Sequence, residues 1–253
     1  MIDIHCHLDA KYTPEQLREF IDSTKLHALI SCGIKPSSWY KHIELKEYYP
    51  INISLGIHPF FVEDSLKGAL DSLDKLIQEN DIVAIGEIGL DYHKEQKESR
   101  EYQIEVFQKQ IQLAKKHNLP IIIHCRKAHQ DLFPILKKEK STGMIFHSFS
   151  GGENELETAL SLGAYISFGF PINYRNNKKQ QHILSLTPID RVVFETDSPY
   201  MKINLEGDEC PPNPLDIELV YKKAAEILCI PINELILQIR ENVKTAFPKI
   251  VSI

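Results

Sequence analysis

The 253-residue sequence lacks the features that mark disulfide-rich and membrane-spanning proteins. It has five cysteines, an odd number without a C-x-x-C pair, so we expect free thiols in a reducing, cytoplasmic location. No apolar run approaches the roughly 20 residues that a membrane helix needs. No Gly/Ser-rich linker or low-complexity segment divides the chain, and we therefore expect a single domain over residues 1–253.

Basic residues are too few to form a broad basic surface that would bind duplex DNA or a membrane. The 29 Lys and Arg residues stand against 35 Asp and Glu residues, which gives a formal net charge of -6. A phosphate substrate stays compatible with this charge, because bound divalent cations would make a site locally positive.

Strand-like and helix-like stretches alternate along the whole chain, which favours a parallel sheet with crossover helices. The expected strands lie near residues 1–8, 27–33, 50–57, 81–88, 119–125, 142–148, 163–169 and 189–197. Helices are expected near residues 14–24, 36–47, 65–79, 98–117, 127–139, 152–162, 177–186, 213–229 and 232–245. Eight strands in a chain of this length predict an α/β fold, a (β/α)8 TIM barrel that could be somewhat distorted.

Potential metal ligands stand at the ends of five of these strands. They are His5, Glu87, His124, His147 and Asp197. The carboxyl ends of barrel strands meet on one face, where such barrels carry their chemistry, so a metal site is expected there. Strand alternation puts Asp3, His5 and His7 on one face of the first strand, and it puts Glu87 on the face of Ile85 and Val83.

Six ligands are more than one four-coordinate site with an open position requires. A centre of two divalent ions (Mg²⁺, Mn²⁺ or Zn²⁺) with one bridging carboxylate is the economical interpretation, and the imidazoles favour Zn²⁺ or Mn²⁺. A single inward His on a strand is more often structural, and only the complete set at strand ends favours metal binding.

Five other polar residues are candidates for supporting roles. His58 is expected to contact substrate rather than metal, and Arg126 is expected to bind a phosphate, with a structural ion pair as the alternative. Asp3 and Glu195 are expected to orient imidazoles, with a buried salt-bridge network as the alternative. Asp91 is as compatible with a loop cap as with a substrate contact.

Motifs along almost the entire chain resemble those of the TatD family of metal-dependent deoxyribonucleases, which are amidohydrolase-like barrels. They are DIHCHLD, GIHPFF, AIGEIGLDY, LPIIIHCRKA, FHSFSGG, ISFG, ETDSPY and, at 241–247, ENVKTAF. The resemblance implies a first ion on His5, His7 and Asp197. It implies a second ion on His124 and His147, with Glu87 bridging both, where many other amidohydrolase barrels use a carboxylated lysine.

The segment after ETDSPY departs from the family pattern. The family usually has an Arg-Asn-Glu-Pro-like stretch there, whereas residues 201–215 read MKINLEGDECPPNPL and carry Glu206, Asp208 and Glu209. The ligand set is unaffected, but an acidic loop is a poor platform for duplex DNA.

The sequence thus predicts a two-metal phosphodiesterase that acts on DNA. Asp197 and Glu87 are the expected catalytic residues, with Asp197 orienting or deprotonating the attacking water and Arg126 offsetting phosphate charge. A barrel mouth would exclude a duplex about 20 Å wide but admit a single-stranded end, and the resemblance favours a 3′ end. The alternatives are a small-molecule hydrolase for a phosphoester, amide or lactone, and a non-catalytic component that keeps the metal site.

Overall fold

Eight parallel strands form one sheet whose spatial order is the order in the chain. The computed structural model describes residues 1–9, 12–93, 99–141, 143–201, 203–205 and 208–251. The strands are β1 (Ile2–Cys6), β2 (Ala28–Gly33), β3 (Asn52–Leu55), β4 (Ala84–Asp91), β5 (Ile121–Arg126), β6 (Met144–Phe146), β7 (Tyr165–Phe168) and β8 (Val192–Phe194). The predicted barrel is confirmed, with most strands shorter than expected.

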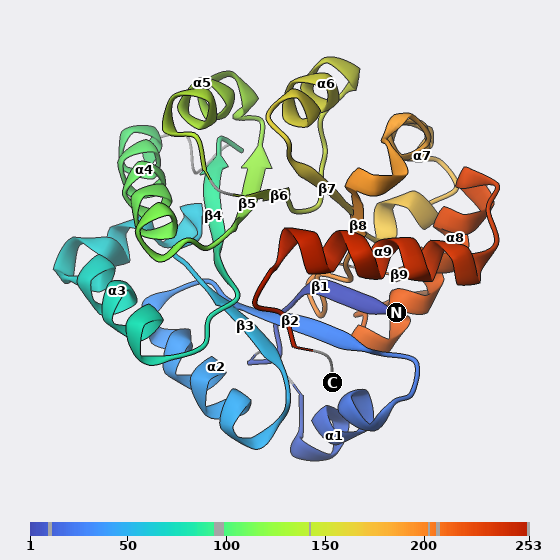
Figure 1. Cartoon of the computed structure of the whole chain (residues 1–253), viewed down its shortest axis with the longest axis horizontal. Helices are drawn as coiled ribbons and strands as arrows, with labels where there is room; N and C mark the ends of the chain where they lie inside the picture. Colours follow the sequence, from blue (N-terminus) through green and yellow to red (C-terminus); the bar gives the residue numbers. More distant parts are fainter. Residues whose placement is uncertain (10–11, 94–98, 142, 202, 206–207, 252–253) are drawn as a thin grey trace.

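Helices surround the sheet on its outer side (Figure 1). They are α1 (Pro14–Asp22), α2 (Pro36–Tyr48), α3 (Ala69–Glu79), α4 (Arg100–His117), α5 (His129–Glu139), α6 (Glu153–Ser161), α7 (Lys178–Leu186), α8 (Ile217–Leu228) and α9 (Ile232–Ala246). Because helices cover one face of each strand and the barrel interior covers the other, Ile121, Ile122 and Ile123 are all fully buried. None of the described helices is both long and apolar enough to span a membrane.

The helix predicted over residues 65–79 is divided in two. A short 3-10 helix, η1 (Pro59–Lys67), precedes α3, and Gly68 between them has a left-handed φ of 76°. Glycine adopts this conformation without the steric cost that a side chain would add. After β3 the chain enters η1, whose N-cap is His58, and it turns at Gly68 into α3.

The seam between the last strand and the first is closed by backbone hydrogen bonds just beyond β8. The amide of Asp197 donates to the carbonyl oxygen of His5 at 2.9 Å, and the amide of His7 donates to that of Ser198 at 2.8 Å. The segment that carries the predicted ligand Asp197 is therefore part of the barrel wall.

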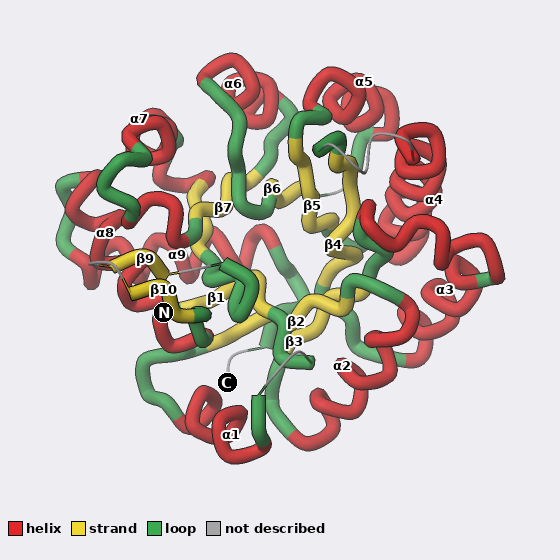
Figure 2. The backbone as a smooth tube through the Cα atoms, turned by 180° about the vertical axis from the view of Figure 1, so that it is seen from behind, coloured by secondary structure: helices red, strands yellow, loops and turns green. Residues whose placement is uncertain are grey.

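One end of the barrel is covered and the other carries the loops. Helix α9 lies in front of the barrel in Figure 1, and Asn242 on it donates to the carbonyl oxygens of Ile189 and Val192, both at 2.7 Å. These carbonyls flank the start of β8, so α9 covers the N-terminal end. Figure 2, seen from behind, shows the hairpin of β9 (Ile203–Leu205) and β10 (Asp208–Cys210) in front. Glu206 of the predicted acidic loop lies outside the described residues.

The contact of Asn242 with the barrel predicts a stability effect. Asn242→Ala removes a donor from the buried carbonyl group of Val192 and from the partly buried one of Ile189, which should lower the free energy of unfolding by about 1–3 kcal/mol in urea titrations. Thr245→Ala, on the exposed side of the same helix, is the control and should change it by less than about 0.5 kcal/mol. Equal effects of the two substitutions would contradict this role of Asn242.

Candidate metal centre

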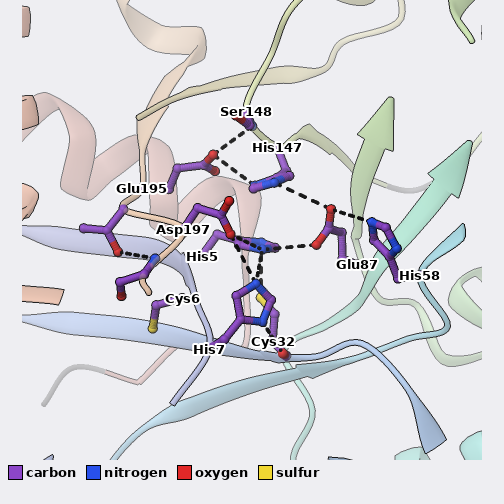
Figure 3. A network of polar contacts seen from close by, with 12 residues as sticks. His5, Cys6, His7, Cys32, His58, Glu87, His147, Ser148, Glu195 and Asp197 are labelled. Atoms are coloured by element: carbon purple, nitrogen blue, oxygen red, sulfur yellow. Dashed lines mark hydrogen bonds and ion pairs between the residues drawn. The ribbon is translucent and has the colours of Figure 1, made fainter. Parts of the chain in front are cut away.

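The structure brings the six predicted ligands together at one end of the barrel. Figure 3 labels five of them, His5, His7, Glu87, His147 and Asp197. Five different parts of the sheet supply them. His5 and His7 come from β1 and the residue after it, Glu87 from β4, His124 from β5, His147 from the residue after β6, and Asp197 from the segment after β8. Figure 3 shows the side chains of His5, His58 and His147 around the Glu87 carboxylate, with His7 beside Asp197.

Glu87 lies at the centre of the cluster. Its Oε1 is 2.6 Å from His124 Nδ1, 3.5 Å from His58 Nε2 and 3.6 Å from His147 Nε2. Its other oxygen, Oε2, is 3.3 Å from His5 Nε2. Burial alone would raise the pKa of Glu87, but the surrounding imidazoles outweigh it and hold the pKa well below its usual value. The two oxygens therefore face different imidazoles, as a bridging carboxylate requires.

Asp197 lies on the other side of His5. Its Oδ1 is 3.2 Å from His7 Nε2 and 3.7 Å from His5 Nε2, and the two Nε2 atoms are 3.2 Å apart. The rings of His5 and His147 are stacked with centroids 3.8 Å apart. Asp197 itself has a left-handed φ of 55°, a conformation that is costly for most residues and is concentrated at functional sites.

The donor atoms fit divalent cations. Three groups each offer three ligand atoms within 4.8 Å of one another: His5, His7 and Glu87; His5, His147 and Asp197; and His58, Glu87 and His124. His5 and Glu87 each belong to two groups, and the mixed nitrogen and oxygen donors suit Zn²⁺ or Mn²⁺. The residues thus offer more ligand atoms than a single four-coordinate ion would use.

Cys32 on β2 contacts two of the imidazoles. Its carbonyl oxygen is 2.9 Å from His7 Nδ1, and its Sγ is 3.2 Å from His5 Nδ1. Contacts on Nδ1 leave Nε2 of each ring turned toward the carboxylates. Sequence reasoning missed Cys32, although its position near the end of the second strand was a usable signal.

Glu195 contacts the ring of His147, where an orienting role was predicted. Its Oε1 is 2.9 Å from His147 Nδ1 and accepts a hydrogen bond from the Ser148 amide at 2.8 Å, while Oε2 accepts one from Ser167 Oγ at 2.5 Å. Burial disfavours a charged His147 ring, but Glu195 and Glu87 outweigh this and raise its pKa to about 10. A cation would therefore have to displace a proton from His147.

Asp91 contacts the ring of His124, which the sequence did not predict. Asp91 Oδ2 is 2.9 Å from His124 Nε2. Gln103 holds the Asp91 backbone: its Oε1 accepts from the Asp91 amide at 2.8 Å, and its Nε2 donates to the Asp91 carbonyl oxygen at 2.9 Å. Strand β4 extends to Asp91, whereas the expected strand ended at residue 88. A longer fourth strand would have placed Asp91 beside the end of the fifth.

The strand alternation assumed for β4 is interrupted at Glu87. Pairing of β4 with β5 shifts register between Ile85 and Ile88, and such a bulge re-aims the intervening side chains. Gly89 follows with a φ of 147°, and a Cβ there would lie 1.9 Å from the carbonyl oxygen of His124. Only glycine allows this close approach of the two ligand-bearing strands.

The described contacts of Asp3 differ from those predicted. Its oxygens accept hydrogen bonds from the amides of His5 (3.2 Å) and Thr196 (3.0 Å) and from Thr196 Oγ1 (2.6 Å), and none of its described hydrogen bonds is with an imidazole ring. Burial raises the pKa of Asp3 to about 8. Asp3 lies two residues below His5, opposite Thr196, so it braces the backbone that leads to Asp197.

His58 and Arg126 lie on different parts of the site. His58 is buried, and its ring is 3.5 Å from the Glu87 carboxylate, so it belongs to the cluster and not only to the rim predicted for a substrate contact. Burial lowers the pKa of His58 to about 3, which keeps the ring uncharged. Arg126 is exposed at the end of β5, and among the described residues its guanidinium has no hydrogen-bond or ion-pair partner.

Comparison with known proteins places this barrel and its cluster of imidazoles and carboxylates among metal-dependent hydrolases. The family described as TatD related DNase matches residues 2–248, so the chain belongs to that family. It is 33% identical to a metal-dependent hydrolase, YabD, of Bacillus subtilis, with 98% of each chain covered. The structure of the TatD homolog YjjV from Escherichia coli matches with a TM-score of 0.90 at 28% identity and 98% coverage of both chains. A TatD family hydrolase from Entamoeba histolytica shares the fold, with a TM-score of 0.87 at 23% identity, over 99% of this chain and 98% of that one.

The contact between Asp91 and His124 predicts an effect on metal affinity. Asp91→Ala removes the group that orients the ring and should weaken binding of Zn²⁺ or Mn²⁺ by at least about tenfold. Titration against a competing chelator measures this effect. Asp190→Ala, which removes an exposed carboxylate at the opposite end of the barrel, should leave the affinity unchanged. Wild-type affinity in the Asp91 variant would show that Asp91 only shapes the loop.

Proposed function

We propose that the chain hydrolyses phosphodiester bonds in DNA with two divalent ions, and that it acts from single-stranded ends. The observation that carries the proposal is the position of Glu87, whose two oxygens face imidazoles on opposite sides. Membership of the TatD related DNase family supports the substrate class.

The two ions would share the ligands around Glu87. On the family resemblance, His5, His7 and Asp197 would hold the first, His124 and His147 the second, and Glu87 would bridge them; all six are among the residues whose ligand atoms cluster around Glu87. His58 is close enough to Glu87 to join the second set, or to contact the substrate beside it. When bound, such a pair of ions activates water and stabilises the attacking and leaving oxygens of the phosphate.

Asp197 is placed to orient the attacking water and to accept its proton. Burial raises the pKa of Asp197, but His7 and the other imidazoles outweigh it and lower the pKa below its ordinary value. The carboxylate is therefore ionised at neutral pH and available as a proton acceptor. Its Oδ1 faces His7 and His5, and its side chain is partly exposed at the mouth of the barrel.

Exposed aromatic side chains on two sides of the cluster favour an unpaired strand. Phe60 is 46% exposed, and its ring centroid lies 4.6 Å from that of His58; Tyr200 is 57% exposed, and its centroid lies 4.9 Å from that of His7. Unpaired bases stack on such rings, whereas bases within a duplex do not reach them. The exposed Arg126 would bind a phosphate of the same strand with its planar fork.

Loss of the bridging charge tests the metal centre. Glu87→Gln keeps the shape of the side chain but removes its negative charge, so it should release metal measured by elemental analysis and lower turnover on single-stranded DNA by at least about 100-fold. A chelator should abolish wild-type activity, and Mg²⁺, Mn²⁺ or Zn²⁺ should restore it. Glu241→Gln on the exposed side of α9 is the control and should behave as wild type. Near wild-type turnover of Glu87→Gln with both ions retained would rule out the bridge.

A closed substrate tests action from ends. A linear single strand should be degraded, with a 3′ end preferred, whereas a covalently closed circle of the same sequence should resist. The reason is that the ligands lie at strand ends within the barrel mouth, where a terminus enters more easily than an internal segment. Arg126→Ala should raise KM on the linear strand without changing metal content. Equal cleavage rates on circle and linear strand would refute the end-dependent mechanism.

A further inference from the structure

A small pocket lies beside the metal cluster, between the ends of β6 and β7 and the start of α7. It has a volume of about 240 Å³, and its lining includes Ser148, Ser167, Gly169, Pro171, Gln180 and Met201. Ser148 follows the ligand His147, and both Ser148 and Ser167 donate to Glu195, the carboxylate that contacts the His147 ring. The pocket is therefore separated from the cluster by one side chain.

Gln180 is the largest polar side chain among the described residues that line this pocket. The residue is only 8% exposed, and its backbone amide donates to Asn177 Oδ1 at 3.3 Å at the start of α7. Among the described residues, its side-chain amide has no hydrogen-bond partner, and its polar atoms stay accessible instead of being sealed in the core. Because Gln180 lines the pocket, a bound group there would supply the missing donor and acceptor.

The other surfaces of the pocket suit a flat, uncharged ring. Phe149, Pro171 and Met201 provide apolar surface, and thioethers make favourable contacts with aromatic rings. No cationic side chain is among the described residues that line it. The Lys179 ammonium donates to the carbonyl oxygen of Ser150 at its edge, and the Glu195 carboxylate lies behind Ser148 and Ser167, so the nearest charges are of both signs and an uncharged ligand is favoured. The volume is below the range of about 300–1,000 Å³ typical of sites for drug-sized ligands, which fits one ring system rather than a whole nucleotide.

We propose that this pocket binds the base of the nucleotide next to the scissile phosphate, and that Gln180 reads the hydrogen-bonding edge of that base. The inference rests on the proposed function, since it assigns a subsite to the same DNA strand. An amide offers one donor and one acceptor side by side, which matches the edges of bases. A base can enter such a pocket only when it is unpaired, so the pocket adds a second reason for single-strand preference.

Methionine methyl groups provide a direct test that needs neither metal nor turnover. The chain has three methionines, and of these Met201 lines the pocket, whereas Met1 and Met144 are buried elsewhere. Deoxynucleosides titrated into protein labelled with ¹³C at the methionine methyls should shift the Met201 signal saturably and leave the other two in place. Deoxyribose and deoxyribose 5-phosphate should not shift it.

Two substitutions test the role of Gln180 in this binding. Gln180→Leu keeps the volume but removes the hydrogen bonds, and it should weaken binding of the best deoxynucleoside by about tenfold. Gln180→Glu keeps an acceptor but loses the donor, so it should favour deoxycytidine and deoxyadenosine, which offer an amino group, over thymidine. Gln78→Leu on the exposed side of α3 is the matched control and should bind as wild type.

Three results would overturn the pocket assignment: no deoxynucleoside shifts Met201, Gln180→Leu binds with wild-type affinity, or deoxyribose 5-phosphate shifts Met201 as strongly as a nucleoside. Hydrolysis of single-stranded DNA by the metal-loaded wild-type protein is measured in parallel. Hydrolysis without nucleoside binding rejects the pocket alone. Nucleoside binding without any hydrolysis of DNA rejects the proposed function and leaves the pocket as a base-binding site.

Discussion

The negative charge of Glu87, buried at the mouth of the barrel, is the constraint on which the arrangement of the site depends. A buried carboxylate is strongly unfavourable unless cations or hydrogen-bond donors surround it. Imidazoles from β1, β5 and the end of β6 meet this need, because their ring nitrogens lie between 2.6 and 3.6 Å from its oxygens. Each of those rings is in turn fixed from behind by Cys32, Asp91 or Glu195. The cluster is thus held by two layers of contacts, and the outer layer fixes which nitrogen faces inward.

The barrel and the six clustered residues could be predicted because both depend on patterns that are local in sequence. Short β-branched runs predict strands, and in a parallel barrel every strand end lies on the same face, so His5, Glu87 and Asp197 could be placed together without coordinates. Metal binding by these residues stays a prediction. The same local logic found Glu195, which follows β8 on the face of Asp197.

The features that were missed depend on contacts between distant segments. Asp91 contacts His124 because β4 continues past a bulge and stays paired with β5, to which it comes close at Gly89. Cys32 contacts His7 through a backbone carbonyl, so its position near the end of β2, and not its side-chain type, was the only signal for this contact. Asp3 was placed correctly on the ligand face, but Thr196, four residues beyond the start of β8, donates a hydrogen bond to its carboxylate. Gln180 lies on a helix face that periodicity would assign to packing alone.

The seam between β8 and β1 lets the β9–β10 hairpin change in sequence without moving the ligand residues that precede it. The backbone at Asp197 and Ser198 is tied to His5 and His7 before the chain continues into the β9–β10 hairpin. Insertions, deletions and charge changes in the hairpin therefore lie beyond the residues whose backbone holds Asp197 in position. Loop exchange among relatives could redirect the protein toward new substrates while the ligand geometry is inherited intact, and the departure of residues 201–215 from the family pattern is compatible with such divergence.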